Sequence, residues 1–141
     1  MHNASDVGII IHMMRETHKR SDCPISCGLD IFGDKWSLLI IRDLVLKKKA
    51  TYGELLESNE KIATNILAKK LNTLVKNKII KKTKNPNDKR SVLYTLTKKG
   101  SDLIPILKEI ILWNAKHDRK TIASKEFIAE VKKIAKIHME S

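Results

Sequence analysis

The chain has 141 residues, which is enough for one compact domain with its own core and too few for two ordinary domains. Hydrophobic residues make up 42% of it but aromatic residues only 4%, which favours helices packed by Leu and Ile. Five glycines and three prolines disfavour an all-β sandwich, which is rich in turns. Two cysteines are too few for a disulfide framework or a four-thiolate zinc site, and the net charge of +12 indicates an anionic partner.

The first part of the chain contains a short apolar run, VGIIIHMM, at residues 7–14. The run is too short to cross a bilayer, Asp6 precedes it, and no small-residue cleavage site follows, so we expect neither a signal peptide nor a membrane span. The protein is therefore predicted to be cytoplasmic. Residues 1–22 are interpreted as an N-terminal extension, and the sequence leaves open whether translation starts at Met13 or Met14 instead.

Residues 25–46 carry apolar side chains at helical spacing, interrupted at Gly33 and Asp34. This pattern predicts two helices or one bent helix, with Pro24 at the first helical position. Cys23 then lies at the cap, where unpaired N–H groups stabilise a thiolate, so it is either a reactive sensor or a small structural thiol. Cys27 lies one turn further on, about 5–6 Å away at Cβ and beyond the range of a disulfide, unless the end of the helix unravels.

Two further helices have the order of a helix-turn-helix. Residues 51–58 begin with Thr51 and Glu54 at capping-box spacing and form a short helix after a loop at 47–49. Residues 62–78 have the clearest period in the chain, with one apolar face and one polar face. The apolar face consists of Leu67, Leu71, Leu74 and Val75, and the polar face consists of Asn65, Lys69, Asn72 and Lys76.

A β-hairpin is predicted directly after this second helix. One strand contains Ile79 and Ile80, the other alternates through residues 91–96, and Asn85-Pro86 suits a type I turn between them. Lys89 and Arg90 lie beside the tip. A hairpin in this position is the wing of a winged helix-turn-helix domain.

The last predicted elements are helical. Thr97 is the expected cap of a long helix, in which Pro105 is expected to cause a bend. Apolar residues at 103–113 cover more of this helix than one core can bury, so the exposed remainder predicts a homodimer interface. The interface candidates are Leu103, Leu107, Ile110, Ile111 and Trp113. An amphipathic segment at 125–139 predicts a further helix, so residues 118–141 are a second candidate for dimer contacts.

The positive charge is concentrated in one segment. Residues 61–100 contain 12 Lys and Arg but a single acidic residue, Asp88, whereas the segments on either side are nearly neutral. A lysine-rich coding bias would spread the cations along the chain, so the clustering favours a bound polyanion. Nucleic acid is the expected partner; the alternatives are an anionic membrane and a solvated surface without a partner.

Several short motifs, in order along residues 23–117, resemble the HxlR-type winged helix-turn-helix regulators, relatives of the MarR-like group. They are Cys23-Pro24, Gly33-x-Lys35-Trp36, LIIRDL at 39–44, Tyr52-Gly53-Glu54-Leu55, Leu67-x3-Leu71-x2-Leu74, Tyr94-x-Leu96-Thr97-x2-Gly100 and Trp113. The resemblance implies a dimeric transcription factor with its second motif helix in the major groove. It also implies that N- and C-terminal helices form the dimer, and that Cys23 corresponds to a cysteine that senses oxidants or electrophiles in some members. The family commonly has a capping Ser where this chain has Ala63, so Thr64 is expected to cap the recognition helix.

The expected fold is therefore mainly α with a small β-hairpin, and residues 23–117 form a winged helix-turn-helix. The protein is expected to bind double-stranded DNA as a homodimer. Amide side chains can read adenine edges, which makes Asn65 and Asn72 candidates for base contacts. Thr64 is a candidate at the start of the helix. The candidates for phosphate contacts are Lys61, Lys69, Lys70, Lys76, Lys89 and Arg90. Arg90 is also a candidate for a narrow minor groove.

Two other classes of function compete with that of a regulator. A non-sequence-specific RNA-binding or nucleoid-type protein would also use the basic segment. A thiol-dependent enzyme would use Cys23 with His18 or His117, but no orienting acid, oxyanion loop or Gly-rich cradle accompanies them, so we expect no enzyme, metal or cofactor. The sequence does not identify the operator, the sign of regulation or a small-molecule effector.

Overall fold

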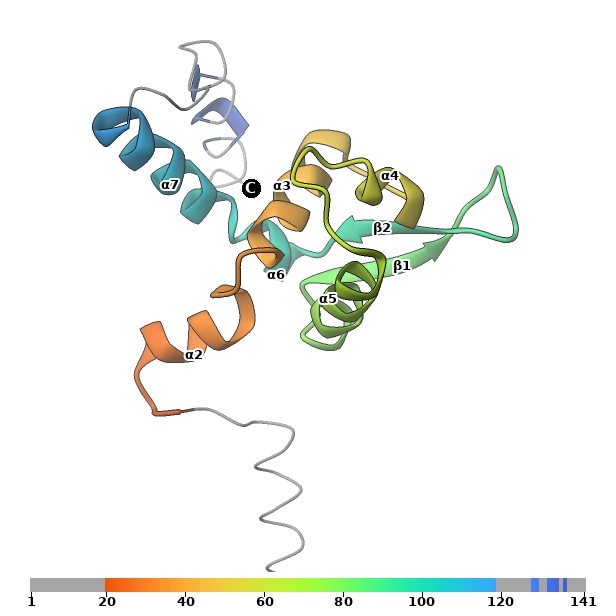
Figure 1. Cartoon of the computed structure of the whole chain (residues 1–141), viewed down its shortest axis with the longest axis horizontal. Helices are drawn as coiled ribbons and strands as arrows, with labels where there is room; N and C mark the ends of the chain where they lie inside the picture. The colour runs from red at the N-terminus through yellow and green to blue at the C-terminus, as the bar shows by residue number, and fades with distance from the viewer. Residues whose placement is uncertain (1–19, 119–127, 130–131, 135, 137–141) are drawn as a thin grey trace, which may run out of the picture. The chain divides into compact units, whose positions relative to one another are not determined.

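The computed structural model describes residues 20–118, 128–129, 132–134 and 136, and the chain divides into two compact units between Lys35 and Trp36. The described part of the first unit contains α2 (Pro24–Phe32). The second contains α3 (Ser37–Lys47), α4 (Tyr52–Leu56), α5 (Thr64–Lys76), β1 (Ile80–Lys84), β2 (Val92–Leu96), α6 (Lys98–Ser101) and α7 (Ile104–His117) (Figure 1). In this part of the chain no helix is both long and apolar enough to span a bilayer.

The predicted break at Gly33 separates two helices and is not a bend within one. α2 starts at Pro24, as predicted, and ends at Gly33, whose N–H donates to the carbonyl of Leu29 at 2.7 Å. A Cβ at position 33 would collide with that same carbonyl oxygen, so only glycine permits this close approach. α3 then begins at Ser37.

The core of the second unit lies where α3, α5 and the hairpin meet. α3 buries Ile40, Ile41 and Leu44, and α5 buries Leu67, Leu71 and Leu74, in agreement with the predicted helical period. The hairpin contributes Ile80 and Tyr94 to the core.

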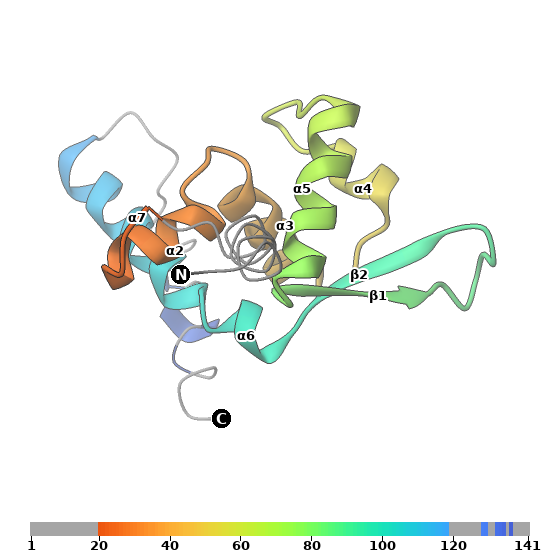
Figure 2. The ribbon, with the colours of Figure 1, turned by 90° about the horizontal axis from the view of Figure 1, so that it is seen from below.

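The hairpin has the predicted antiparallel order. Its register pairs Ile80 with Leu96 and Lys84 with Val92. Ala50 forms a bridge to Tyr94 on the other side of β2, a pairing that the sequence analysis missed. In both views the hairpin extends beyond the helices and carries the loop 85–91 at its far end (Figure 1, Figure 2).

The prediction of one long helix from Thr97, bent at Pro105, is wrong. Thr97 does cap a helix, because its hydroxyl accepts the N–H of Gly100 at 3.0 Å, but that helix is α6 and ends at Ser101. α7 starts separately at Ile104, so Pro105 lies in its first turn, where its missing N–H removes no helical hydrogen bond. Proline is therefore compatible with the start of α7 and has no interior helix to bend.

The predicted capping of α5 by Thr64 is also wrong. Ala63 is the N-cap, in an extended conformation and without a side-chain hydrogen bond, and Thr64 is the first helical residue. The Ala63 carbonyl accepts the N–H of Leu67 at 2.9 Å, so the backbone closes the first turn without a capping side chain.

The described residues do not cover all of the predicted terminal elements. Residues 1–19 lie outside them, and so do most of the positions in the predicted helix at 125–139. Residues 128–129, 132–134 and 136, which lie within that segment, are helical.

Candidate nucleic-acid interface

α4 and α5 form a helix-turn-helix whose start is set by local hydrogen bonds. Thr51 and Glu54 make the predicted capping box: the Glu54 N–H donates to Thr51 Oγ1 at 3.2 Å, and the Thr51 N–H donates to Glu54 Oε1 at 3.1 Å. The Thr51 backbone N–H, and then the Thr51 hydroxyl, lower the pKa of the Glu54 carboxyl by interacting with its charged form. The Tyr52 hydroxyl donates to the carbonyl of Thr64 at 2.8 Å, which ties the first turn of α4 to the first turn of α5.

A charged network joins α3 to the turn between α4 and α5. The Arg42 guanidinium donates to both carboxylate oxygens of Glu60 at 2.8 Å each, and it also donates to Ser58 and Asp43. Ser58 Oγ donates in turn to Glu60 Oε1 at 2.6 Å. Arg42 and then Ser58 hold the pKa of Glu60 at about 2, and Glu60 in turn raises the pKa of Arg42. This network was not predicted from the sequence, although Arg42 lies within the LIIRDL motif.

α5 presents the predicted polar stripe to solvent. Asn65, Lys69, Asn72 and Lys76 are all exposed, while Leu67, Leu71 and Leu74 on the opposite side are buried. Among the described residues, the side chains of these four make no hydrogen bond or ion pair. The stripe therefore presents hydrogen-bond donors and acceptors to solvent, while the buried leucines on the other side of α5 hold the helix against the core.

The other candidates on this motif lie around the stripe. Thr64 is exposed at the first position of α5, and Lys70 is half-buried and engaged in an interaction with the surrounding structure. Lys61 is exposed in the turn before α5, with a φ of 56° in the left-handed region. A non-glycine residue in this conformation is uncommon, which marks the turn as a constrained point of the motif.

The wing carries the remaining predicted cations. Lys89 and Arg90 lie in the loop 85–91 and are exposed, and the Arg90 side chain is 97% accessible. The predicted turn at Asn85-Pro86 is confirmed by the Asp88 N–H, which donates to the Asn85 carbonyl at 3.3 Å. Lys81, Lys82 and Lys84 on β1 are also exposed. These three lysines are not among the predicted contact residues, although the excess of lysine in residues 61–100 includes them.

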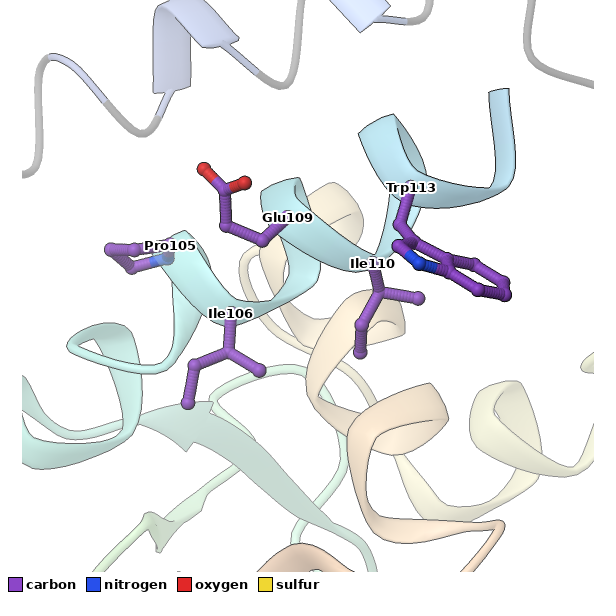
Figure 3. Close-up of a pocket in the computed structure, with 5 residues that line it drawn as sticks. All are labelled: Pro105, Ile106, Glu109, Ile110 and Trp113. Carbon is purple, nitrogen blue, oxygen red and sulfur yellow. The ribbon is translucent and has the colours of Figure 1, made fainter. Parts of the chain in front are cut away.

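The predicted dimer residues lie on α7 and on the residue before it. Leu103, Leu107 and Ile111 are half-buried, whereas Ile110 and Trp113 are 43% and 63% exposed. A shallow groove of about 450 Å³ is lined by five side chains of α7, which Figure 3 shows together. They are Pro105, Ile106, Glu109, Ile110 and Trp113. The indole of Trp113 also contacts the His117 ring, with the ring centroids 5.1 Å apart.

Cys23 belongs to the other compact unit and occupies the predicted cap of α2. Its thiol is exposed, and its side chain does not form a capping hydrogen bond. The nearby backbone N–H groups of Ser26 and then Ile25 nevertheless lower the pKa of the thiol. Two basic residues, Lys19 and Arg20, precede Cys23 in the sequence. Arg20 is paired with Asp30 at 3.0 Å, and Lys19 lies outside the described residues.

Cys27 is positioned differently from Cys23. It is half-buried, and its Sγ donates to the carbonyl of Ser21 at 3.3 Å. Its backbone N–H donates to the carbonyl of Cys23 at 2.9 Å, so the first turn of α2 is intact. Neither Cys23 nor Cys27 forms a disulfide.

A short helix, a turn, a second helix with an exposed polar stripe and a basic hairpin together define a winged helix-turn-helix, a class of DNA-binding domain. Residues 31–121 match the HxlR-like helix-turn-helix family. The chain therefore belongs to this family and is a helix-turn-helix transcriptional regulator.

Two curated relatives are similar over most of the domain. BH0655, an uncharacterized HTH-type transcriptional regulator of Halalkalibacterium halodurans, is 30% identical over 96 residues, which cover 68% of this chain and 85% of BH0655. The HTH-type transcriptional regulator YodB of Bacillus subtilis is 32% identical over 92 residues, which cover 64% of this chain and 81% of YodB.

Solved structures have the same architecture. The crystal structure of PA1607 superposes with a TM-score of 0.64 at 35% identity, covering 72% of this chain and 69% of PA1607. The reduced form of YodB superposes with a TM-score of 0.58 at 26% identity, covering 72% of this chain and 99% of YodB. These matches bear out the predicted family and the predicted winged-helix fold.

Proposed function

We propose that the protein binds a palindromic DNA operator as a homodimer, with α5 in the major groove and the hairpin against the neighbouring backbone. The observation that carries this proposal is the stripe of Asn65, Lys69, Asn72 and Lys76, which is exposed and has no partner in the described part of the chain. Ammonium groups neutralise phosphates and amides pair with base edges, so this stripe suits a duplex better than any smaller anion.

The candidate residues then divide by chemistry. Asn65 and Asn72 read bases, and Lys61, Lys69, Lys76 and Lys89 contact phosphates. The remaining three act at the edges of the interface. Thr64 offers its hydroxyl beside the start of α5, Lys70 reaches the backbone from the margin of the stripe, and Arg90 extends from the wing toward a minor groove.

The exposed apolar face of α7 is the proposed dimer contact. Ile110 and Trp113 are too exposed for the core of one subunit, and Leu103, Leu107 and Ile111 border them. We assign residues 23–117 to the winged helix-turn-helix with its dimerisation helices, 1–22 to an extension and 118–141 to a further dimer segment. A dimer places two α5 helices on half-sites about one helical turn, or about 34–36 Å, apart.

Cys23 is the proposed sensor of oxidants or electrophiles. Its thiol is exposed and its pKa is lowered, which favours the nucleophilic thiolate. YodB has been crystallised in a quinone-bound form and in a diamide-treated form, and this chain is 28% identical to each of these two structures. Modification of Cys23 would act through α2 on the spacing of the two recognition helices.

DNA sites selected by the protein from a random duplex pool test the operator proposal. A two-fold symmetric consensus is expected, whereas recovery of unrelated sequences at equal affinity would favour a nucleoid-type protein. On the selected duplex, Lys69→Ala is expected to weaken binding and to flatten the slope of log K against log salt by about one unit. Asn65→Ala is expected mainly to reduce discrimination between operator and random DNA.

Lys116→Ala serves as the control for charge, because Lys116 is exposed on α7, a helix that lies apart from α4, α5 and the hairpin (Figure 1). Its salt slope is expected to equal that of the unmodified protein. An unchanged slope for Lys69→Ala would refute the phosphate assignment.

The sensor proposal has a separate test. Operator affinity is measured before and after treatment with diamide or a quinone, in the unmodified protein and in Cys23→Ser. A loss of affinity that depends on Cys23 is expected. Equal responses of the two proteins would exclude Cys23 as the sensor.

A further inference from the structure

The turn between α4 and α5 carries a lysine in a conformation that suits glycine. Lys61 has a φ of 56°, in the left-handed region, which is unfavourable for a residue with a Cβ atom. Its side chain is exposed just before α5 and has no partner in the described part of the chain. Glycine would adopt this φ without strain, so a lysine is kept there only if its neighbours hold it in place.

The backbone is anchored on both sides of Lys61. The Lys61 N–H donates to the Ser58 carbonyl at 2.9 Å, which closes the turn from the side of α4. Ile62, the next residue, is 7% exposed and belongs to the core. The left-handed conformation of Lys61 therefore depends on residues 58–60 staying in place.

Arg42 on α3 holds these residues. Its Nη1 and Nη2 donate to the two carboxylate oxygens of Glu60 at 2.8 Å each, and its Nη2 also donates to Ser58 Oγ at 3.1 Å. Its Nε donates to Asp43 at 2.9 Å, so the guanidinium is oriented from its own helix. The planar fork of arginine can make two parallel bonds to one carboxylate, which the single ammonium group of a lysine cannot do.

The same pairing affects what the Lys61 ammonium can bind. Glu60 precedes Lys61 in the chain, and its oxygens accept hydrogen bonds from Arg42 and from Ser58. A carboxylate without these partners could pair with Lys61 or repel a phosphate beside the turn. With Arg42 in place, the charge of Glu60 is compensated and the Lys61 side chain stays exposed.

We propose that Arg42 is a positioning residue for DNA binding, because it fixes the turn that holds Lys61 in the left-handed conformation and keeps the Lys61 ammonium free for a phosphate. This inference rests on the proposed contact of Lys61 with DNA. Arg42 is half-buried and directs its guanidinium at the turn and at Asp43, so it acts through Lys61 and not by touching the duplex.

Two variants loosen the network without changing the charge of the protein. Arg42→Lys keeps a cation on α3 but loses the paired bonds to Glu60, and Ser58→Ala removes the hydroxyl between Arg42 and Glu60. The probe is a duplex of about 30 base pairs from the random pool, on which Arg42→Lys is expected to bind about three- to tenfold more weakly. Its slope of log K against log salt is expected to flatten by up to about one unit, and that of Ser58→Ala by less.

A double-mutant cycle distinguishes the positioning of Lys61 from a general loosening of α5. Lys61→Ala alone is expected to flatten the salt slope by about one unit. In that background Arg42→Lys is expected to cause no further loss, because no ammonium remains to be positioned. A loss of full size without Lys61, or an unchanged slope for Arg42→Lys with Lys61 present, would overturn the proposal.

Arg20→Lys is the matched control for the exchange of arginine by lysine. Arg20 is also paired with an acid, Asp30, but it belongs to the other compact unit. Its salt slope is expected to equal that of the unmodified protein. An equal flattening in this control would count against a specific role of Arg42.

Amide hydrogen exchange of the free protein separates this inference from the proposed function. The Lys61 N–H is expected to exchange about tenfold faster in Arg42→Lys than in the unmodified protein. The Leu67 N–H, which donates to the Ala63 carbonyl in the first turn of α5, is the internal reference and is expected to exchange equally in both. Equal protection of the Lys61 N–H, or an equal acceleration at Leu67, would refute the positioning role. Faster exchange at Lys61 alone, with no duplex bound even by the unmodified protein, would refute the proposed function while the hold of Arg42 on the turn stands.

Discussion

The network of Arg42 and Glu60 predicts a specific dependence of stability on pH. Glu60 lies in the turn that precedes α5, and its carboxylate receives two hydrogen bonds from Arg42 and one from Ser58. Glu60→Gln keeps the size of the side chain but removes its charge. The half-buried guanidinium of Arg42 then retains Asp43 as its remaining charged partner in the described structure.

The size of the effect follows from the pKa. The folded pKa of Glu60 is about 2 instead of 4.5, and about 1.4 kcal/mol per pKa unit gives an upper limit of about 3 kcal/mol. The side chains of Arg42 and Glu60 are 28% and 35% exposed, so solvent screens the pair, and we expect about 1–1.5 kcal/mol at neutral pH. Because the folded pKa is depressed, this stabilisation is complete above about pH 4.5 and is lost as the pH falls toward about 2.

Urea unfolding followed by circular dichroism measures this dependence. The free energy of unfolding of Glu60→Gln is expected to be lower than that of the unmodified protein by the same amount between pH 6 and 8. Less than about half of the difference is expected at pH 3. Glu57→Gln is the matched control, because Glu57 is an exposed acid in the same turn and has no side-chain partner among the described residues. A difference that stays constant down to pH 3, or an equal effect of Glu57→Gln, would refute the role of the ion pair.

Three further predictions follow from local geometry. Gly100→Ala is expected to destabilise the domain by about 2–3 kcal/mol in urea unfolding, because a Cβ there would overlap the carbonyl oxygen of Ile79 and backbone cannot move aside; a loss below about 0.5 kcal/mol would contradict it. Lys78→Gly is expected to stabilise the domain by about 0.5 kcal/mol, because Lys78 has a φ of 60° that glycine adopts without strain, and a lower urea midpoint would contradict this. Alkylation of Cys23 by iodoacetamide is measured by mass spectrometry in a Cys27→Ser background. The alkylation rate is expected to rise with pH, with a midpoint below the value of about 8.5 for a free thiol, because the pKa of Cys23 is lowered. A midpoint at or above that value would contradict the prediction.

Much of the helix-turn-helix could be predicted from the sequence because its signals are local. The capping box of Thr51 and Glu54 depends on residues three apart, and the two faces of α5 depend on a period of about four residues. The turn at Asn85-Pro86 is equally local. Each of these patterns acts within one turn of chain, so neighbouring residues are sufficient to specify it.

The wrong predictions, by contrast, concern helix boundaries that the local sequence pattern does not specify. Thr97 is a good cap and Pro105 a good first-turn residue, and the sequence does not show that α6 stops between them and a new helix starts. Gly100 in α6 lies against the carbonyl of Ile79, which precedes the whole hairpin, and such a distant contact is not visible in the local sequence. The side chain of Ala63 predicts a poor cap, whereas in the structure its backbone carbonyl closes the first turn of α5 by accepting the N–H of Leu67.

By itself the sequence determined the class of domain and the chemistry of its proposed DNA-binding side, because hydrophobic period, caps and the lysine excess are properties of short stretches. The tertiary structure alone decided how these stretches are held. The ion pair between Arg42 and Glu60 spans 18 positions, and the bridge between Ala50 and Tyr94 joins a loop to a strand beyond both motif helices. Such contacts depend on the path of the whole chain, since residues far apart in sequence meet only after the core of leucines and isoleucines has folded.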